Sequence, residues 1–385
     1  MKSSPKTVYL HIGLHKTGST TIQHFLKDNK NILLKLGYLY PESGSVYSGQ
    51  HNLSWQLSQD PRYSRQYGGW EELYTEIAST SVNNVILSSE DFEILKPKQI
   101  NLLRLKLQPY HTKIIVYIRR QDSLIQSVYT QQVKGGLKKT FEEFLREAIN
   151  LKCKTSKRFQ FHLHLRPWKK QFGLENIIVR PLETHQLYQE DLCLDFLNCI
   201  GFPVSNLSRD TQNSNKLFFQ ADNAESYELI LPQNKNESPS YQTLEIMRFI
   251  SNVISQKVEK DDLDLKQYLK PILRYYQNSQ SDSDKFNQLT QQLSLDILKT
   301  FEKSNRIIAE EYLLREDGKL FSDEIKERDI THFNISEISS EQQLEVMLIL
   351  IHDIWKKLDT IQQDIKTLKS SSLNLNEIES DLEEI

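Results

Sequence analysis

The sequence predicts an α/β fold in which a parallel β-sheet is flanked by helices, with a helical segment at the C-terminal end. Short runs of β-branched residues recur along the first half of the chain, amphipathic stretches separate them, and polar residues follow them. Continuous apolar runs are typical of parallel strands that are buried on both faces. In such sheets the ligand site lies beyond the carboxyl ends of the strands.

The predicted elements follow one another in a regular order. The predicted strands are Thr7–Ile12, Asn84–Leu87, Lys113–Ile118 and Asn176–Val179, and the clearest helices are Thr21–Leu36 and Asp122–Gln132. Beyond about residue 200 we expect helical, polar sequence, with a surface loop at Gln277–Asp284.

Polar clusters follow three of these predicted strands. They are Gly13–Thr21, Ser88–Asp91 and Arg119–Arg120. Because the carboxyl ends of parallel strands meet at one edge of a sheet, we expect the three clusters to converge on one crevice.

Composition narrows the class of protein. Aromatic residues make up 10% of the 385 residues, too many for a disordered chain. The chain contains no run of 18 apolar residues, the length that a membrane span needs. Its net charge is −3, so no global basic field attracts nucleic acid. The three cysteines, Cys153, Cys193 and Cys199, have no metal-site spacing, and no apolar leader follows Met1. We therefore expect a cytoplasmic protein without disulfides.

The C-terminal region carries a different pattern. From Met347 to Leu368, apolar residues alternate at steps of four and three, which is a heptad seam. The seam predicts a coiled coil that forms a homo-oligomer, a dimer or a trimer; a helix packed on its own domain is the alternative. We expect a main domain over residues 5–325, a coiled-coil segment over 335–369 and an acidic tail over 370–385.

The segment Gly13–Thr21 reads G-L-H-K-T-G-S-T-T between a predicted strand and a predicted helix. Successive backbone N–H groups and a helix N-terminus bind anions, and the Lys16 ammonium adds a point charge. A nucleoside triphosphatase loop carries lysine directly after its second glycine, where this chain has Ser19 after Gly18. That difference disfavours an ATPase. A tight strand–helix turn without a ligand is the alternative.

Two motifs together resemble the sulfotransferases that use 3′-phosphoadenosine 5′-phosphosulfate (PAPS). Lys16–Thr21 is similar to their 5′-phosphosulfate loop, K-[ST]-G-[ST]-[ST]. Their 3′-phosphate motif is an Arg with a Ser eight residues later, and here Arg119 follows a predicted strand and Ser127 lies eight residues on, with Tyr129 two further. An Arg fork and a hydroxyl suit a phosphate dianion. A strand-capping Arg and a helix-surface Ser are the alternative.

The resemblance extends over about residues 5–325. Trp168–Pro181 and Ser304–Phe321 are similar to the later strand and closing helix of bacterial, carbohydrate-type members. The R-K-G motif of the small-molecule branch is absent, which leaves part of the 3′-phosphate site unassigned. The family implies sulfuryl transfer from PAPS to a carbohydrate or glycoconjugate hydroxyl, with no metal required. His162 and His164, expected on a strand or loop, are interpreted as structural.

The resemblance also implies roles for individual residues. Lys16 stabilises the leaving oxygen and the sulfonate. Glu90 is the expected base, because carbohydrate-type members use a Glu and it follows a predicted strand; a carboxylate that only favours a helix N-terminus is the alternative. His51 is the other candidate base. The residues expected to bind the nucleotide are His15, Lys16, Thr17, Gly18, Ser19, Thr20, Thr21, Arg119 and Ser127.

Two other functions remain open at this point. A P-loop kinase of a small metabolite would use magnesium and ATP, with Val85–Leu87, before Ser88–Asp91, taken as a Walker B strand. A catalytically inactive, oligomeric nucleotide-binding scaffold would act through Met347–Leu368. The sequence does not identify the acceptor.

Overall fold

The computed structural model describes most of the chain in two compact units. The described residues are 5–210, 213–221, 223, 225–232, 239–257, 269–274 and 286–327, with 330, 344, 346–348, 351, 360 and 363. One unit, here called the sheet unit, comprises Met1–Val128, Glu142–Asn236 and Leu289–Arg328. The other, the helical unit, comprises Tyr129–Phe141, Glu237–Gln288 and Asp329–Ile385. The predicted boundaries at 325, 335 and 369 stay predictions.

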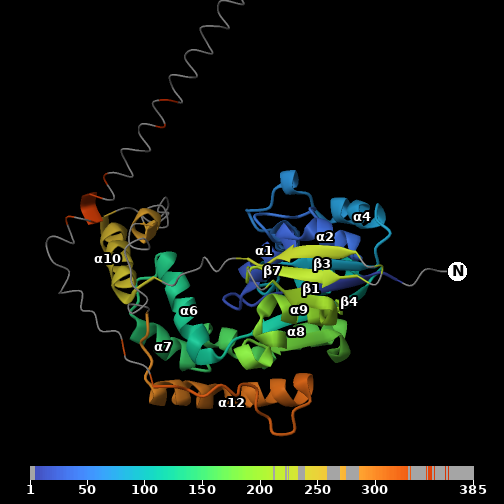
Figure 1. Ribbon diagram of the computed structural model, residues 1–385. Helices are drawn as coiled ribbons and strands as arrows, with labels where there is room; N and C mark the ends of the chain where they lie inside the picture. Colours follow the sequence, from blue (N-terminus) through green and yellow to red (C-terminus); the bar gives the residue numbers. More distant parts are fainter. Residues whose placement is uncertain are drawn as a thin grey trace, which may run out of the picture. The chain divides into compact units, whose positions relative to one another are not determined.

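A five-stranded parallel sheet forms the centre of the sheet unit (Figure 1). In spatial order its strands are β2 (Tyr38–Leu39), β3 (Asn84–Ser88), β1 (Thr7–His11), β4 (His111–Ile118) and β5 (Ile177–Pro181). The four predicted strands are confirmed to within two residues at each end. The two-residue strand β2 is too short to carry a periodic signal, and sequence reasoning missed it.

Helices precede and follow the strands, which confirms the predicted α/β fold. Their bounds are α1 (Ser19–Asp28), α2 (Lys30–Lys35), α3 (His51–Ser58), α4 (Trp70–Ala78), α5 (Pro97–Lys106), α6 (Gln121–Lys134), α7 (Phe141–Ile149), α8 (Phe161–Phe172), α9 (Leu192–Cys199), α10 (Tyr241–Lys257) and α12 (Gln291–Leu313).

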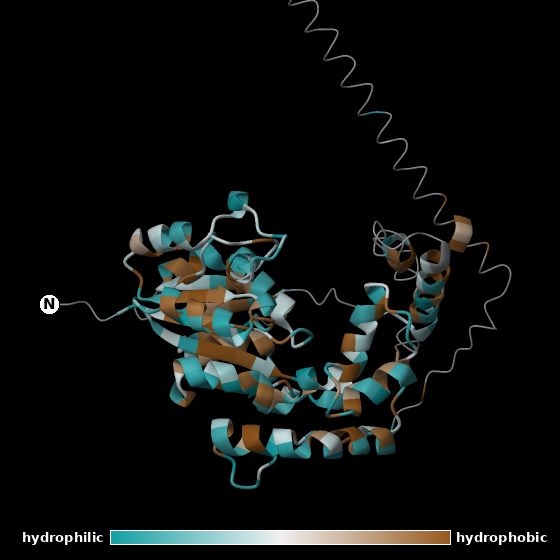
Figure 2. Cartoon of the chain, turned by 180° about the vertical axis from the view of Figure 1, so that it is seen from behind, coloured by the Kyte–Doolittle hydropathy of each residue, from teal (hydrophilic) through white to brown (hydrophobic). Residues whose placement is uncertain are grey.

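The sheet is buried on both faces because its strands are apolar at successive positions, as their brown colour in Figure 2 shows. On one face, Tyr9 and Ile115 join a core cluster with Phe25 of α1 and Phe196 of α9. Since successive side chains alternate between faces, Leu10 lies on the opposite face, where it is also fully buried. Helix α8 contacts β4 and β5, and α5 and α12 contact α8.

The predicted helix over Thr21–Leu36 is broken at Asn29 into α1 and α2. The Asn29 amide donates to the carbonyls of Phe25 (2.7 Å) and Ile230 (2.8 Å), and its side-chain oxygen accepts from the Ile230 N–H at 2.8 Å. Asparagine side chains compete with helical hydrogen bonds in this way, and here the competitor is a strand distant in sequence.

The prediction of helical sequence beyond residue 200 is wrong for the first segment after that point. An antiparallel sheet forms there from β6 (Leu207–Arg209), β7 (Lys216–Gln220) and β8 (Ser226–Ile230). Leu217 and Phe219 alternate with exposed residues along β7 and join the core cluster. The predicted loop Gln277–Asp284, most of the seam Met347–Leu368 and the acidic tail lie outside the described residues.

The helical unit has an aromatic centre of its own. The Tyr129 ring stacks on Phe286 with centroids 5.5 Å apart, and Phe141 meets both rings edge-on. Tyr241 of α10 packs on Phe286 at 5.5 Å.

Neither a membrane-spanning helix nor a disulfide occurs among the described residues. Within the described ranges, no helix combines the length and apolarity that a membrane crossing requires. Cys153, Cys193 and Cys199, all of them described, are free thiols, as expected.

A buried acid joins helix α9 to two strands of the sheet. Asp195 is fully buried and accepts hydrogen bonds from the Tyr117 hydroxyl of β4 (2.8 Å) and from Arg180 Nε of β5 (3.0 Å). Replacing it leaves a buried hydroxyl and a guanidinium without their acceptor.

We predict that Asp195→Ala lowers the free energy of unfolding by about 3 kcal/mol, the cost of breaking a buried pair from one side. Denaturant unfolding followed by tryptophan fluorescence measures the change. Glu142→Ala is the matched control, because it removes a carboxylate from an ion pair whose Glu142 side chain is 75% exposed. Equal stability of the two variants would contradict the role of Asp195.

Candidate anion-binding site at the carboxyl edge of the sheet

The three polar clusters meet at one edge of the parallel sheet. Strand β1 lies between β3 and β4 in the sheet. The chain leaves β1 for β2, at one edge of the sheet, and leaves β4 for β5, at the other edge. Such a reversal of strand order opens a crevice beyond the carboxyl ends. The clusters are close: a Cβ added to Gly13 would lie 2.8 Å from the Cα of Glu90, and the Ser89 N–H donates to the His11 carbonyl at 3.1 Å. The predicted convergence of these two segments is confirmed.

The loop after β1 wraps its backbone into a concave turn. Gly13, Lys16 and Gly18 all have left-handed φ angles, of 65°, 74° and 86°. Gly18 caps α1, and a Cβ there would lie 2.4 Å from a methyl of Leu192. Glycine is favoured at Gly18 because of the left-handed backbone angle, and any side chain there would also displace the Leu192 methyl.

Hydrogen-bond donors at the start of α1 are unused. The backbone N–H groups of Gly18, Ser19 and Thr20 bond to no other described residue, and the buried Ser19 hydroxyl also lacks a partner in the described part of the chain. The N–H groups at a helix N-terminus carry a partial positive charge. Together these groups form a donor cradle suited to a phosphate-like anion.

Three cationic side chains act on one another beside this cradle. Burial lowers the pKa of Lys16, and the nearby charges of Arg119 and Arg158 lower it further, while Glu90 opposes the shift. Arg119 directly follows β4, as predicted, whereas Arg158 was not predicted as a site residue. Crowding of like charges is unfavourable unless an anion is bound among them.

Arg120, the neighbour of Arg119, has a structural partnership instead. Its Nε lies 3.0 Å from an Asp122 carboxylate oxygen, and Nη1 donates to the Asp323 carbonyl at 2.9 Å. Arg120 therefore ties the end of β4 to the segment that follows α12.

Glu90 is held next to the loop by a residue that sequence reasoning missed. Gln23 of α1 donates from Nε2 to a Glu90 carboxylate oxygen at 2.7 Å. The Glu90 side chain is half-buried, so it stays accessible to a ligand. An accessible carboxylate at the crevice can accept a proton from a ligand.

His51, the other candidate base, is engaged in packing. It begins α3, its Nδ1 lies 2.8 Å from the Ser89 hydroxyl and 3.4 Å from Asp91, and only 8% of the residue is exposed. Its ring stacks on Trp55, which donates to Asp91 at 2.7 Å. These contacts fix the position of the His51 ring beside Ser89 and Asp91.

The remaining predicted residues lie on the loop, on α1 or on α6. The Thr17 hydroxyl donates to the Leu14 carbonyl at 2.6 Å and so closes the loop on itself. Thr20 is exposed and Thr21 half-buried at the start of α1. Ser127 lies half-buried on α6, the helix that begins two residues after Arg119.

Glu93 is a buried carboxylate that the sequence did not single out. It accepts from both the backbone N–H and the Nδ1 of His15 at 2.6 Å, and Arg158 Nε lies 3.6 Å from its other oxygen. Burial raises its pKa, but the His15 hydrogen bond and the Arg158 charge outweigh this and lower the pKa to about 2. Glu93 thus fixes a loop residue and an arginine at once.

The prediction that His162 and His164 lie on a strand or loop is wrong, because both are in helix α8. Burial lowers the pKa of each. His162 Nδ1 and His164 Nε2 are buried and have no hydrogen-bond partner in the described part of the chain.

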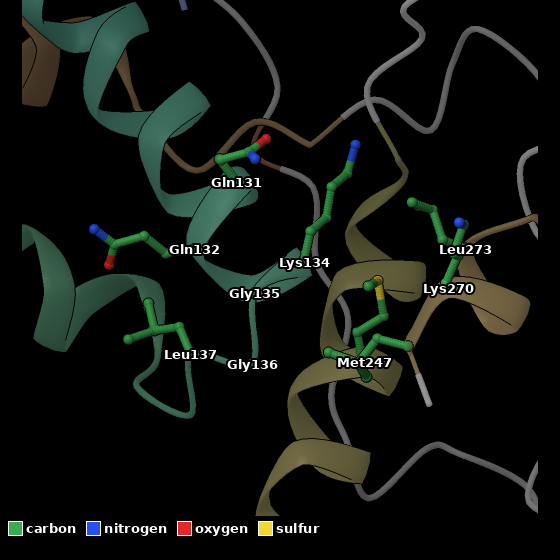
Figure 3. Close-up of a pocket in the computed structure, with 10 residues that line it drawn as sticks. Gln131, Gln132, Lys134, Gly135, Gly136, Leu137, Met247, Lys270 and Leu273 are labelled. Atoms are coloured by element: carbon green, nitrogen blue, oxygen red, sulfur yellow. The ribbon is translucent and has the colours of Figure 1, made fainter. Parts of the chain in front are cut away.

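A separate cavity of about 710 Å³ lies within the helical unit (Figure 3). Its lining includes Gln131 and Lys134 of α6, Gly136, Met247 of α10 and Lys270, and none of the described lining residues carries a carboxylate. It contains none of the predicted site residues. The residues singled out in the sequence therefore lie outside this cavity.

Comparisons with known proteins give limited likenesses. No protein-family model matches the chain. A protein of Archaeoglobus fulgidus described as an uncharacterized protein is 32% identical over 120 residues, which cover 31% of this chain and 31% of that relative's length. The crystal structure of a sulfotransferase from Alicyclobacillus acidocaldarius matches with a TM-score of 0.33 and 12% identity, over 66% of this chain and 94% of that one. Neither likeness assigns the chain to a family.

We predict that Glu93→Gln destabilises the protein at neutral pH and that the deficit shrinks in acid. The native pKa of Glu93, about 2, lies below its ordinary value of 4.5, so its contribution is present above pH 4.5 and is lost as pH falls towards 2. The full contribution is up to about 3 kcal/mol.

The free energy of unfolding of both proteins, measured between pH 7 and 2, gives the deficit directly. Glu142→Gln serves as the control. Because Glu142 belongs to an exposed ion pair, we expect its effect on the free energy of unfolding to be small at every pH. A deficit for Glu93→Gln that stays constant with pH would show that its charge is not the cause.

Proposed function

We propose that this protein is a sulfotransferase that moves a sulfuryl group from PAPS to a hydroxyl of a carbohydrate or glycoconjugate. The observation that carries the proposal is the pairing of the donor cradle after β1 with Arg119 after the adjacent strand β4. The order and spacing of these two segments resemble those of PAPS enzymes.

The donor is an anion at both ends, and the proposed site offers neutral hydrogen-bond donors for one end and a guanidinium for the other. The loop amides, the Ser19 hydroxyl and the side chains of Thr20 and Thr21 would bind the 5′-phosphate. Arg119 and Ser127 would bind the 3′-phosphate through a guanidinium fork and a hydroxyl. A kinase has no use for a 3′-phosphate site, which is why we prefer a sulfotransferase.

Sulfuryl transfer requires positioning and charge stabilisation more than covalent chemistry from the protein, as phosphoryl transfer does. In the proposed reaction the acceptor oxygen forms a bond to sulfur as the bond from sulfur to the bridging phosphate oxygen breaks. Glu90 takes the proton of the acceptor hydroxyl, and Lys16 stabilises the negative charge on the leaving oxygen. The products are the sulfate ester and 3′,5′-adenosine bisphosphate, and no metal is required.

The broader expectations remain part of the proposal. They are a cytoplasmic location, no nucleic-acid partner, a domain over residues 5–325, and a homo-oligomer formed through Met347–Leu368. A coiled coil there is followed by an acidic tail.

We predict that the protein binds 3′,5′-adenosine bisphosphate and that Arg119→Ala weakens this binding by about tenfold or more, because a charge-assisted contact to phosphate is lost. Lys16→Ala abolishes transfer of radiolabelled sulfate from PAPS to hydroxyl acceptors. Calorimetry and the transfer assay measure the two effects.

Arg146→Ala is the matched control for lost positive charge, since Arg146 is 68% exposed in an ion pair on α7. If the protein bound ATP in a magnesium-dependent manner and had no affinity for the bisphosphate, the proposed function would be a kinase and not a sulfotransferase. Unchanged turnover in Lys16→Ala would remove Lys16 from the mechanism.

For the base, we predict that Glu90→Gln lowers kcat by about 100-fold or more while the affinity for the bisphosphate is retained, because a positioned base contributes this much to proton transfer. His51→Gln is the comparison that separates the two candidates. Loss of turnover in the His51 variant alone, with a normal melting temperature, would assign the base to His51.

A further inference from the structure

Arg158 is anchored beside the candidate site from two directions. It lies in a short 3₁₀ helix, Thr155–Phe159, whose neighbouring side chains Ser156 and Phe159 are fully buried. The Phe159 carbonyl accepts from Gln121, which begins α6 two residues after Arg119. The backbone around Arg158 is thereby fixed close to the segment that carries Arg119.

The second anchor leads to the loop after β1. Arg158 Nε lies 3.6 Å from one oxygen of Glu93, and the other oxygen of this carboxylate accepts two hydrogen bonds from His15. Because His15 is a residue of the loop, Glu93 links Arg158 to the segment that carries the donor cradle.

The Arg158 guanidinium keeps its hydrogen-bonding capacity. It makes an ion pair with Glu93 but donates no hydrogen bond to any described residue, and its side chain is 32% exposed. Guanidinium groups carry five N–H donors in a fixed fork that matches phosphate and sulfate oxygens. Arg62 is a useful contrast, because its fork is already occupied by both oxygens of Asp60.

The charges at the site also favour an anion next to Arg158. Arg119 and Arg158 both repel the half-buried Lys16 and lower its pKa, after burial itself. An anionic ligand among the three groups would convert this repulsion into attraction.

We propose that Arg158 is a third cationic residue of the donor site and binds the 5′-phosphate end of the nucleotide. This inference rests on the proposed function. It assigns Arg158 to the 5′ end because Glu93 links it to His15 of the phosphate loop, whereas Arg119 serves the 3′-phosphate.

Three nucleotides that differ in phosphate position test this assignment in the full-length protein. Calorimetry measures the affinity of wild type and Arg158→Gln for 3′,5′-adenosine bisphosphate, 5′-AMP and 3′-AMP. We expect the variant to lose about tenfold or more for the two ligands that carry a 5′-phosphate, as a charge-assisted contact disappears. Binding of 3′-AMP stays within about twofold, since it reports on a folded site that lacks only this contact.

Two further variants complete the test. Lys157→Gln removes the same charge from the adjacent, exposed position and is expected to leave all three affinities unchanged. Arg158→Lys keeps a point charge and is expected to retain part of the 5′-phosphate affinity.

The possible results separate the two proposals. If the wild type binds the bisphosphate and Arg158→Gln binds it equally tightly, the role of Arg158 is overturned and the sulfotransferase proposal stands. A loss confined to 3′-AMP and the bisphosphate, or an equal loss for all three nucleotides, also overturns the assignment to the 5′ end. A wild-type protein that does not prefer the bisphosphate to 5′-AMP overturns the proposed function itself.

Discussion

The parallel pairing of β1 with both β3 and β4 is the constraint on which the site depends. In this register His11 lies opposite Ser88, and the residues that follow each strand emerge at the same edge. The carboxyl ends of parallel strands lie at the same edge of a sheet, so three loops separated by about a hundred residues of sequence share one crevice. Antiparallel pairing of any of these strands would send its loop to the opposite edge.

At that edge, two carboxylates are bound by neighbouring side chains and do not fill the cradle. Glu93 binds His15 and Arg158 from within the core, and Glu90 is bound by Gln23 beside the loop. Donors without a hydrogen-bond partner in the described part of the chain include the N–H groups of Gly18, Ser19 and Thr20, the Ser19 hydroxyl and the Arg158 guanidinium. The fold thus satisfies its buried acids and leaves hydrogen-bond donors for an anion.

Sequence reasoning succeeded where structure is local. The β-branched runs predicted four strands, because a buried parallel strand has a continuous apolar pattern. It failed where partners are distant in sequence. Asn29 breaks a helix by binding β8, the antiparallel sheet forms from strands of three to five residues, and Glu93 pairs with His15 and Arg158 across 78 and 65 positions.

The two candidate bases, Glu90 and His51, illustrate the same limit within the site. Both occur in polar segments that the sequence places near the crevice, and their residue types suit a base equally well. What distinguishes them is contact: His51 is enclosed by Ser89, Asp91 and Trp55, while Glu90 has one oriented hydrogen bond and remains accessible. Such a difference in packing has no signature in the order of residues along the chain.

The left-handed backbone of Lys16 has a consequence for how this loop can be altered. A side chain at a φ of 74° costs about 1 kcal/mol or more relative to glycine, which adopts that angle freely. Glycine at this position would therefore stabilise the protein in the absence of a ligand, but it would remove the ammonium group. Improved thermal tolerance and loss of the ammonium group would arise together from one substitution, so screening this loop for stability alone would select against the proposed anion site.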